Sequence, residues 1–137
     1  MNRPWPQEKY PCFKSPPLFA YFPAKNIDRA RRFYEEKLGL VPKSVNDGGV
    51  TYEFKGGTAA FLYLTDNAGT SKASQAFWSV EDVDREIAEL KKRGVVFERY
   101  DDTPGERSRE GAVIAGGAKA AWFKDSEGNI LAIVQSL

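Results

Sequence analysis

The stretch Ala121-Trp-Phe-Lys-Asp-Ser-Glu-Gly-Asn-Ile-Leu131 carries the pattern that decides the fold. Apolar segments flank its polar centre and predict two strands, over Ala120–Lys124 and Ile130–Gln135. The residues between them, 125–129, are Asp, Ser, Glu, Gly and Asn, a composition typical of a turn. This segment is therefore expected to form two strands joined by a turn.

A helix and two further strands are predicted upstream of this turn. Gln75–Val80 has the composition of a strand, and Val95–Asp101 is expected to be another. Between them, Asp82 can cap a helix that Gly94 closes. The apolar positions of this helix recur at helical spacing: Val83, Ile87 and Leu90. Residues 75–137 thus predict one βαβββ module.

The same order of elements is predicted for residues 18–65. Leu18–Phe22 is a short apolar run suited to a buried strand. Asn26 can cap a helix that runs to about Lys37, and Gly39 can end it. Three strand-like segments follow: Val41–Val45, Val50–Lys55 and Ala59–Thr65.

The two halves can be aligned through their helix starts. Asn26-Ile-Asp-Arg29 matches Asp82-Val-Asp-Arg85, and the small, polar residues 66–74 between the halves are expected to be a linker. A repeat of about 55 residues with a helix at the same place indicates duplication of one unit. We therefore expect one α+β domain over residues 18–137, in which two tandem modules form a curved, cleft-forming mixed sheet with helices outside.

Composition excludes several classes of function. The chain has 137 residues, a net charge of +1, one cysteine and no histidine. Without histidine there is no Ser-His-Asp triad, no HExxH zinc helix and no two-histidine iron site. A near-zero net charge gives no indication of nucleic acid or anionic membrane as a partner. No signal-peptide or membrane-spanning pattern is found, so a cytoplasmic location is expected.

Residues 1–17 differ from the rest of the chain and hold five of its eight prolines. Proline restricts its own backbone and that of the preceding residue, so an extended arm is predicted. Trp5, Tyr10 and Phe13 make this arm apolar. It is expected either to pack on its own domain, the interpretation we favour, or to contact a second subunit. A homodimer is predicted, with the arm as apolar surface to bury.

The duplicated pattern resembles the vicinal oxygen chelate superfamily, which groups glyoxalases, bleomycin resistance proteins and extradiol dioxygenases. The resemblance covers about residues 18–137. The segments that carry it are Asn26–Tyr34 with Leu38-Gly-Leu40, Val80–Asp84, Leu90–Gly94 and Ala121–Leu131. It implies the tandem βαβββ fold, and members commonly pair as dimers.

The resemblance also implies a divalent metal held by four His, Glu or Gln side chains, one from each inner strand. The equivalent positions here are Phe19, Phe61 or Tyr63, Gln75 and Ala132. Of these only Gln75 could bind a metal, and one neutral amide is a poor ligand set. We therefore expect no metal site and no cofactor, and metal-dependent glyoxalase or dioxygenase activity is not expected. Members of the metal-free type bind or sequester small molecules.

Strand alternation predicts which side chains would line the cleft, because residues two apart on a strand share a face. The predicted cleft residues are Phe19, Tyr21, Phe61, Tyr63, Gln75, Phe77 and Ala132. Aromatic walls with one amide suit a small, largely apolar or aromatic ligand. Two alternatives remain open. The aromatics could fill the cleft and leave a subunit that pairs with another protein. The chain could also be a lyase, isomerase or dioxygenase-type enzyme of the superfamily, using a cleft carboxylate, a tyrosine or an unobvious metal.

Two carboxylates and two arginines are candidates for such chemistry. Glu53 or Glu98 could act as a cleft acid or base if buried beside aromatic rings. Arg107 and Arg109 could hold an anionic ligand at the cleft mouth, although a solvated loop is the more ordinary interpretation.

Overall fold

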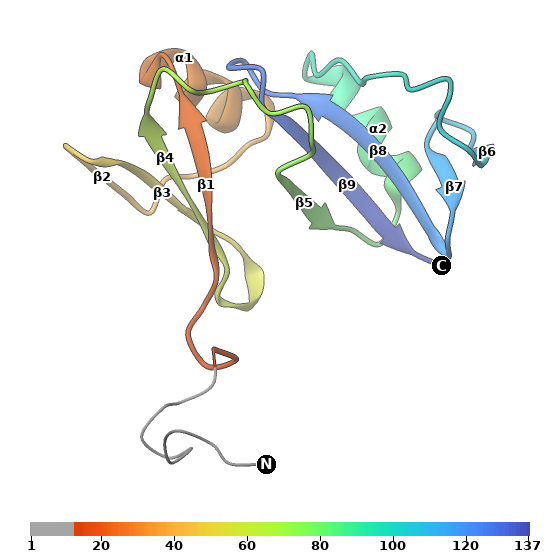
Figure 1. Ribbon diagram of the computed structural model, residues 1–137, viewed down its shortest axis with the longest axis horizontal. Coiled ribbons are helices and arrows are strands. Elements are labelled where there is room, and N and C mark those ends of the chain that lie inside the picture. The colour runs from red at the N-terminus through yellow and green to blue at the C-terminus, as the bar shows by residue number, and fades with distance from the viewer. Residues whose placement is uncertain (1–12) are drawn as a thin grey trace, which may run out of the picture.

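The computed structural model describes residues 13–137, and their strands form two sheets (Figure 1). The first sheet has the order β1 (Phe19–Ala24), β4 (Ala59–Leu64), β3 (Gly49–Glu53) and β2 (Ser44–Asn46). The second has the order β5 (Ala76–Ser79), β9 (Ile130–Ser136), β8 (Ala118–Lys124), β7 (Val113–Ala115) and β6 (Glu106–Arg107). Most of the predicted N-terminal arm, including Trp5 and Tyr10, lies outside the described residues.

The two sheets have equivalent topology. In each one, the first strand of the module pairs in parallel with the last, β1 with β4 and β5 with β9, and the remaining pairs are antiparallel. The predicted α+β fold with two tandem βαβββ modules is thus confirmed. Its strands divide into two mixed sheets, one for each module.

Each module has one helix, and both helices begin at the predicted caps. The Asn26 side chain accepts a hydrogen bond from the Arg29 N–H at 2.9 Å, which starts α1 (Ile27–Arg32). Helix α1 continues as a π-helical turn, η2 (Phe33–Lys37). Asp82 accepts from the Arg85 N–H at 3.1 Å and starts α2 (Val83–Lys92). Neither helix is long and apolar enough to cross a membrane, and these are the α-helices of residues 13–137.

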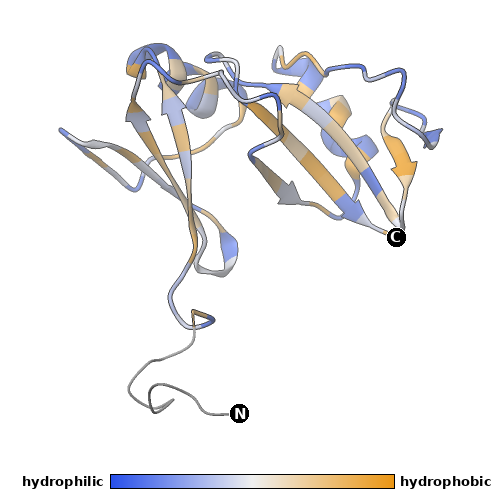
Figure 2. Ribbon diagram, in the orientation of Figure 1, coloured by the Kyte–Doolittle hydropathy of each residue, from blue (hydrophilic) through white to orange (hydrophobic). Residues whose placement is uncertain are grey.

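One apolar core joins the two modules. Phe22 on β1 stacks on Tyr34 at a ring distance of 4.7 Å and lies 6.3 Å from Trp78 on β5. Phe33 lies 6.3 Å from Phe123 on β8. Figure 2 shows the apolar character of β7 and much of β9. The helix-covered side of each sheet faces this shared core, and on the opposite sides large rings such as Tyr21 and Phe77 are exposed, so these are here called the open sides.

The predicted strand over Val95–Asp101 is wrong. With β8 this segment makes one isolated bridge, Phe97 to Phe123, and a hydrogen bond from the Glu98 N–H to the Trp122 carbonyl at 2.8 Å. The physical reason is competition for the edge of β8. Residues 118–120 of that edge already pair with β7, a short strand that the sequence did not reveal, and only 121–124 remain. The other predicted strands agree with the structure to within a few residues.

Candidate ligand-binding faces of the two sheets

The open side of the first sheet, here named the β1–β4 face, carries four aromatic rings: Phe19, Tyr21, Phe61 and Tyr63. Tyr21 pairs with Phe61 in the strand register, and their rings meet edge-on at 6.4 Å. The Tyr21 ring also meets Tyr63 edge-on at 5.0 Å. Phe19 is 49% exposed and Tyr21 65% exposed, and both line a shallow cavity of about 290 Å³. This face therefore presents aromatic surface to solvent.

The open side of the second sheet, here named the β5–β8 face, is organised in rows by the strand register. Phe77, Ala132 and Trp122 are direct neighbours on β5, β9 and β8 and form an aromatic row. Phe77 is 62% exposed, whereas Ala132 is nearly buried between its neighbours. The next row towards the 125–129 turn consists of Gln75, Ile130 and Lys124. It is polar at both ends, with Ile130 in the middle. An apolar row with a small central residue thus lies beside a polar row.

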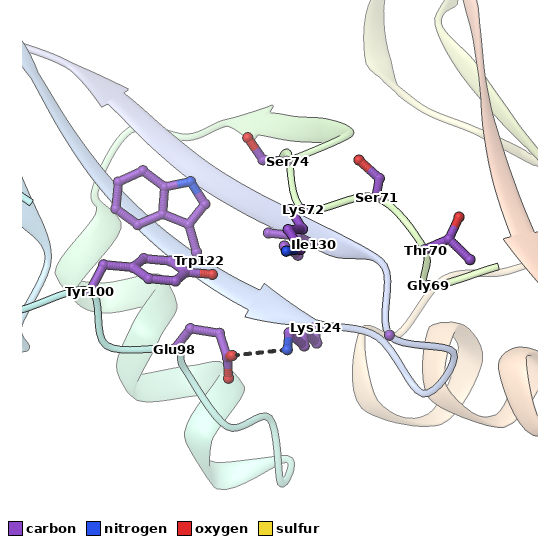
Figure 3. A pocket seen from close by; sticks show the side chains of 11 residues that line it. Gly69, Thr70, Ser71, Lys72, Ser74, Glu98, Tyr100, Trp122, Lys124 and Ile130 are labelled. Carbon is purple, nitrogen blue, oxygen red and sulfur yellow. Dashed lines mark ion pairs between the residues drawn. The ribbon is translucent and has the colours of Figure 1, made fainter. Parts of the chain in front are cut away.

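A cavity of about 520 Å³ opens on this face (Figure 3). The Trp122 ring meets the Tyr100 ring edge-on at 5.6 Å, and the two form one end of the cavity. The Lys124 ammonium lies 3.5 Å from the Glu98 carboxylate, an ion pair drawn as a dashed line in Figure 3. The loop between the modules adds Thr70, Ser71, Lys72 and Ser74 to the lining. The cavity therefore combines aromatic, hydroxyl and charged groups.

The structure divides the seven predicted cleft residues between the two open faces. Phe19, Tyr21, Phe61 and Tyr63 lie on the β1–β4 face, and Gln75, Phe77 and Ala132 lie with the second sheet. Gln75 and Phe77 line a cavity of about 550 Å³ that reaches the edge of β1, and it is separate from the cavity lined by Tyr21 and Phe61. One chain alone therefore does not bring all seven side chains around one space.

Sequence reasoning missed three residues of the β5–β8 face: Tyr100, Trp122 and Lys124. A signal for two of them was present. With 125–129 predicted as a turn, symmetric pairing about it places Lys124 opposite Ile130 and Trp122 opposite Ala132, as observed. No comparable signal marked Tyr100, because its segment is irregular.

The 125–129 turn that sets this register is itself held by buried hydrogen bonds. One Asp125 oxygen accepts from the N–H groups of Glu127 and Asn129 at 2.8 and 2.9 Å. The Asn129 side chain donates to the Pro23 carbonyl at 2.7 Å and accepts from the Gly69 N–H at 3.1 Å. The turn is thereby fixed to the first module, and the position of Trp122 opposite Ala132 is fixed with it.

The four positions that the resemblance assigns to a metal do not fit one. Phe19 and Ala132 have no donor atom, and Phe19 lies on a different sheet from Gln75. Phe61 and Tyr63 offer at most one phenol, which is a weak ligand beside a neutral amide. Within residues 13–137, no group of three or more His, Cys, Asp or Glu side chains is arranged to hold a metal ion.

The other candidate residues fall in different places. Glu98 lines the 520 Å³ cavity, whereas Glu53 pairs with Lys43 at 2.7 Å, both side chains being well exposed. The Arg107 guanidinium donates to three backbone carbonyls, those of Tyr100, Thr103 and Gly105, so it orders its own loop. Arg107 and Arg109 line a further cavity of about 460 Å³ beside α2.

Comparison with known proteins supports the fold. The model of the family described as Glyoxalase/Bleomycin resistance protein/Dioxygenase superfamily matches residues 19–133. No curated protein matches the chain significantly by sequence.

Solved structures with the same fold are distant in sequence. The crystal structure of UcmS2 gives a TM-score of 0.70 at 18% identity, covering 88% of this chain and 98% of that one. A glyoxalase/bleomycin resistance protein/dioxygenase from Alicyclobacillus acidocaldarius gives 0.66 at 19% identity, covering 90% and 92%. TnmS3, described as an antibiotic binding protein from Streptomyces sp. CB03234, gives 0.62 at 24% identity, covering 90% and 97%.

Proposed function

Because this chain belongs to the glyoxalase, bleomycin resistance protein and dioxygenase superfamily, we propose that it binds a small, largely aromatic molecule without the family's metal ion. The observation that carries this proposal is the aromatic row of the β5–β8 face. Two rings, Phe77 and Trp122, flank the small side chain of Ala132 on a sheet side that no helix covers. Aromatic side chains left open in this way are a typical lining of sites for planar ligands.

The spacing of the strands suits one planar ring. Neighbouring strands lie about 4.8 Å apart, so the backbones of Phe77 and Trp122 are separated by about 9.6 Å across β9. A ring held between two other rings at contact distances of about 3.5–4.0 Å needs roughly 7–8 Å. The backbone spacing therefore leaves room for one ring and not for two stacked rings. Because Ala132 is only 3% exposed in the single chain, the side chains of Phe77 and Trp122 turn apart to admit the ring.

We propose that a second copy of the chain completes the cleft. The β1–β4 face is also aromatic and open, but in one chain it lines a different cavity. A homodimer that sets the β1–β4 face of one copy against the β5–β8 face of the other would bring all seven predicted residues together. It would also cover Tyr21 and Phe77, which are large exposed rings in the single chain.

One structural relative supports a binding function. TnmS3 shares the fold and is described as an antibiotic binding protein. By analogy, a sequestering role for this chain agrees with its aromatic face and with its lack of suitable ligand side chains at the four metal positions.

The test uses 2-naphthamide, a planar, neutral probe with one hydrogen-bonding edge. We expect it to raise the melting temperature, since a ligand that binds only the native state stabilises that state. Ala132→Trp should abolish the shift by filling the space between Phe77 and Trp122. Gln75→Leu should weaken binding by about 0.5–1.5 kcal/mol, the net contribution of one hydrogen bond.

The matched control is Ala115→Trp, which adds the same ring at an exposed alanine at the end of β7. It should leave the naphthamide shift unchanged. Equal shifts for the Ala132→Trp variant and the unaltered chain, with both proteins folded by circular dichroism, would contradict the proposal.

A second candidate function is enzymatic, and the position of Glu98 favours it. Its carboxylate lies in the cavity beside Tyr100 and Lys124, where it could transfer a proton to or from a bound molecule. Each compound that raises the melting temperature can be incubated with the protein and recovered. Mass spectrometry or chromatography then shows whether the compound has been converted to a product. Conversion by the unaltered chain but not by Glu98→Gln would establish an enzyme, and unchanged recovery supports binding alone.

A further inference from the structure

We infer that the ligand is an aromatic anion, a planar ring with a carboxylate or a similarly acidic oxygen on one edge, and that Lys124 recognises its charge. This inference rests on the proposed function and narrows it to a chemical class. It follows from the charges around the 520 Å³ cavity and from their place relative to the aromatic row.

The cavity carries more positive than negative charge. Its lining contains two ammonium groups, Lys72 and Lys124, and one carboxylate, Glu98. Within residues 13–137, Lys72 makes no ion pair and no side-chain hydrogen bond. Lys124 meets Glu98 only at 3.5 Å, an ion pair without a close hydrogen bond, and its side chain is 51% exposed. An incoming anion therefore finds one ammonium group, Lys72, that no carboxylate of the described residues pairs, and a second, Lys124, whose long ion pair with Glu98 leaves its N–H donors available.

The strand register places this charge where a ring substituent would lie. Lys124 pairs with Ile130, two residues along β9 from Ala132 and on the same face. Two residues of a strand span about 6.6 Å. For a ring seated on Ala132, a carboxylate bonded directly to that ring and aimed at the turn comes within hydrogen-bond reach of the flexible Lys124 side chain.

Gln75, at the other end of the polar row from Lys124, also favours a ligand with an acidic edge. Its backbone N–H donates to the Ile130 carbonyl, so it lies across Ile130 from Lys124. The side-chain amide of Gln75 can donate a hydrogen bond to a carboxylate oxygen through its NH2 group, as readily as its carbonyl oxygen can accept one from a neutral donor. The polar row therefore offers donors at both ends, and an acidic edge satisfies both.

The experiment compares 2-naphthoate with its neutral isostere 2-naphthamide by isothermal titration calorimetry. We expect naphthoate to bind about fivefold more tightly, the equivalent of about 1 kcal/mol for a partly exposed ion pair. Lys124→Gln should remove this preference, and Lys124→Arg should retain it. Lys92→Gln, at an exposed lysine on α2 paired with Glu89, is the matched control and should change nothing.

A substitution at Glu98 should change the preference for naphthoate in the opposite direction to Lys124→Gln. Glu98→Gln releases Lys124 from its ion pair, so the preference for naphthoate should increase. Raising the salt concentration should weaken naphthoate binding and leave naphthamide binding nearly unchanged, because salt screens charge.

The outcomes separate this inference from the proposed function. Equal affinity of the unaltered chain for the two probes would overturn the anion inference while leaving small-molecule binding in place. A preference that persists in Lys124→Gln would also overturn it, because another group would then recognise the charge. Failure of both probes to bind would overturn the inference together with the proposed function.

Discussion

At the scale of single residues, Glu127 joins the two modules through hydrogen bonds and an ion pair. One of its oxygens accepts from the N–H groups of Lys25 and Asn26 at 2.9 and 3.0 Å. The Arg29 guanidinium donates to both oxygens, at 2.7 and 2.9 Å, and the Ser126 hydroxyl donates at 2.8 Å. The Glu127 side chain is fully buried, so this carboxylate depends on these partners for its charge.

These partners lower the pKa of Glu127, which predicts that the stability of the fold falls at acidic pH. Burial raises the pKa, but the hydrogen bonds from Arg29, Ser126 and the backbone of Asn26 and Lys25 outweigh it and lower the pKa from 4.5 to about 2. A lowered pKa stabilises the fold above pH 4.5, and this stabilisation is lost as the pH falls towards 2. We expect it to contribute on the order of 2–3 kcal/mol to the free energy of unfolding.

Urea unfolding of the unaltered chain and of Glu127→Gln, between pH 7 and pH 2, measures this contribution. The variant should be less stable at pH 7 and should lose less stability on acidification. Burial raises the pKa of Asp84 too, but hydrogen bonds from Ser108, the Glu110 N–H and Lys119 lower it overall, so some acid sensitivity should remain. Glu53→Gln, at an exposed carboxylate, is the control, and parallel curves for all three proteins would refute the assignment.

At the scale of elements, the structure contains the repeat predicted from sequence, but equivalent residues of the two copies have different surroundings. Asn26 and Asp82 cap the two helices in the same extended conformation. Two positions later, Asp28 is exposed, whereas Asp84 is buried and accepts from the Ser108 hydroxyl and the Glu110 N–H. Local patterns could predict the caps because a cap bonds within its own first turn. They could not predict the burial of Asp84, which depends on a loop about 25 residues away.

The caps give a prediction at this scale. Asp82→Ala should lower the free energy of unfolding by about 1 kcal/mol, because it leaves the Arg85 N–H without its side-chain acceptor. Asp82→Asn keeps an acceptor oxygen and should cost only a few tenths of that amount. Chemical denaturation at pH 7 gives both values, and an equal loss in the two variants would show that charge rather than capping is responsible.

At the scale of the whole molecule, local sequence patterns were informative about the modules, whereas the expected single cleft concerns their packing, which such patterns do not determine. Hydrophobic periodicity and turn residues are local, so they predicted both βαβββ units and, through strand alternation, the residues that share each face. Whether the two faces meet depends on how the modules dock, and the core that docks them is made of long-range contacts such as Phe22 with Trp78. For this reason the sequence could assign Phe19 and Gln75 to faces, whereas the prediction that both line one cleft depends on the second copy of the chain proposed above.

The proposed dimer gives the last prediction, and it follows from that division of faces. Light scattering should give about twice the chain mass of 15.3 kDa. If each cleft takes one face from each copy, two damaged variants should complement one another. Tyr21→Ala with Phe61→Ala removes rings from the β1–β4 face, and Ala132→Trp blocks the β5–β8 face, so neither protein alone should bind 2-naphthamide. After unfolding and refolding as an equal mixture, half of the dimers are mixed and each has one intact cleft, which restores about a quarter of the sites. A monomer at high micromolar concentration, or a mixture that binds no better than its components, would contradict a cleft shared between copies.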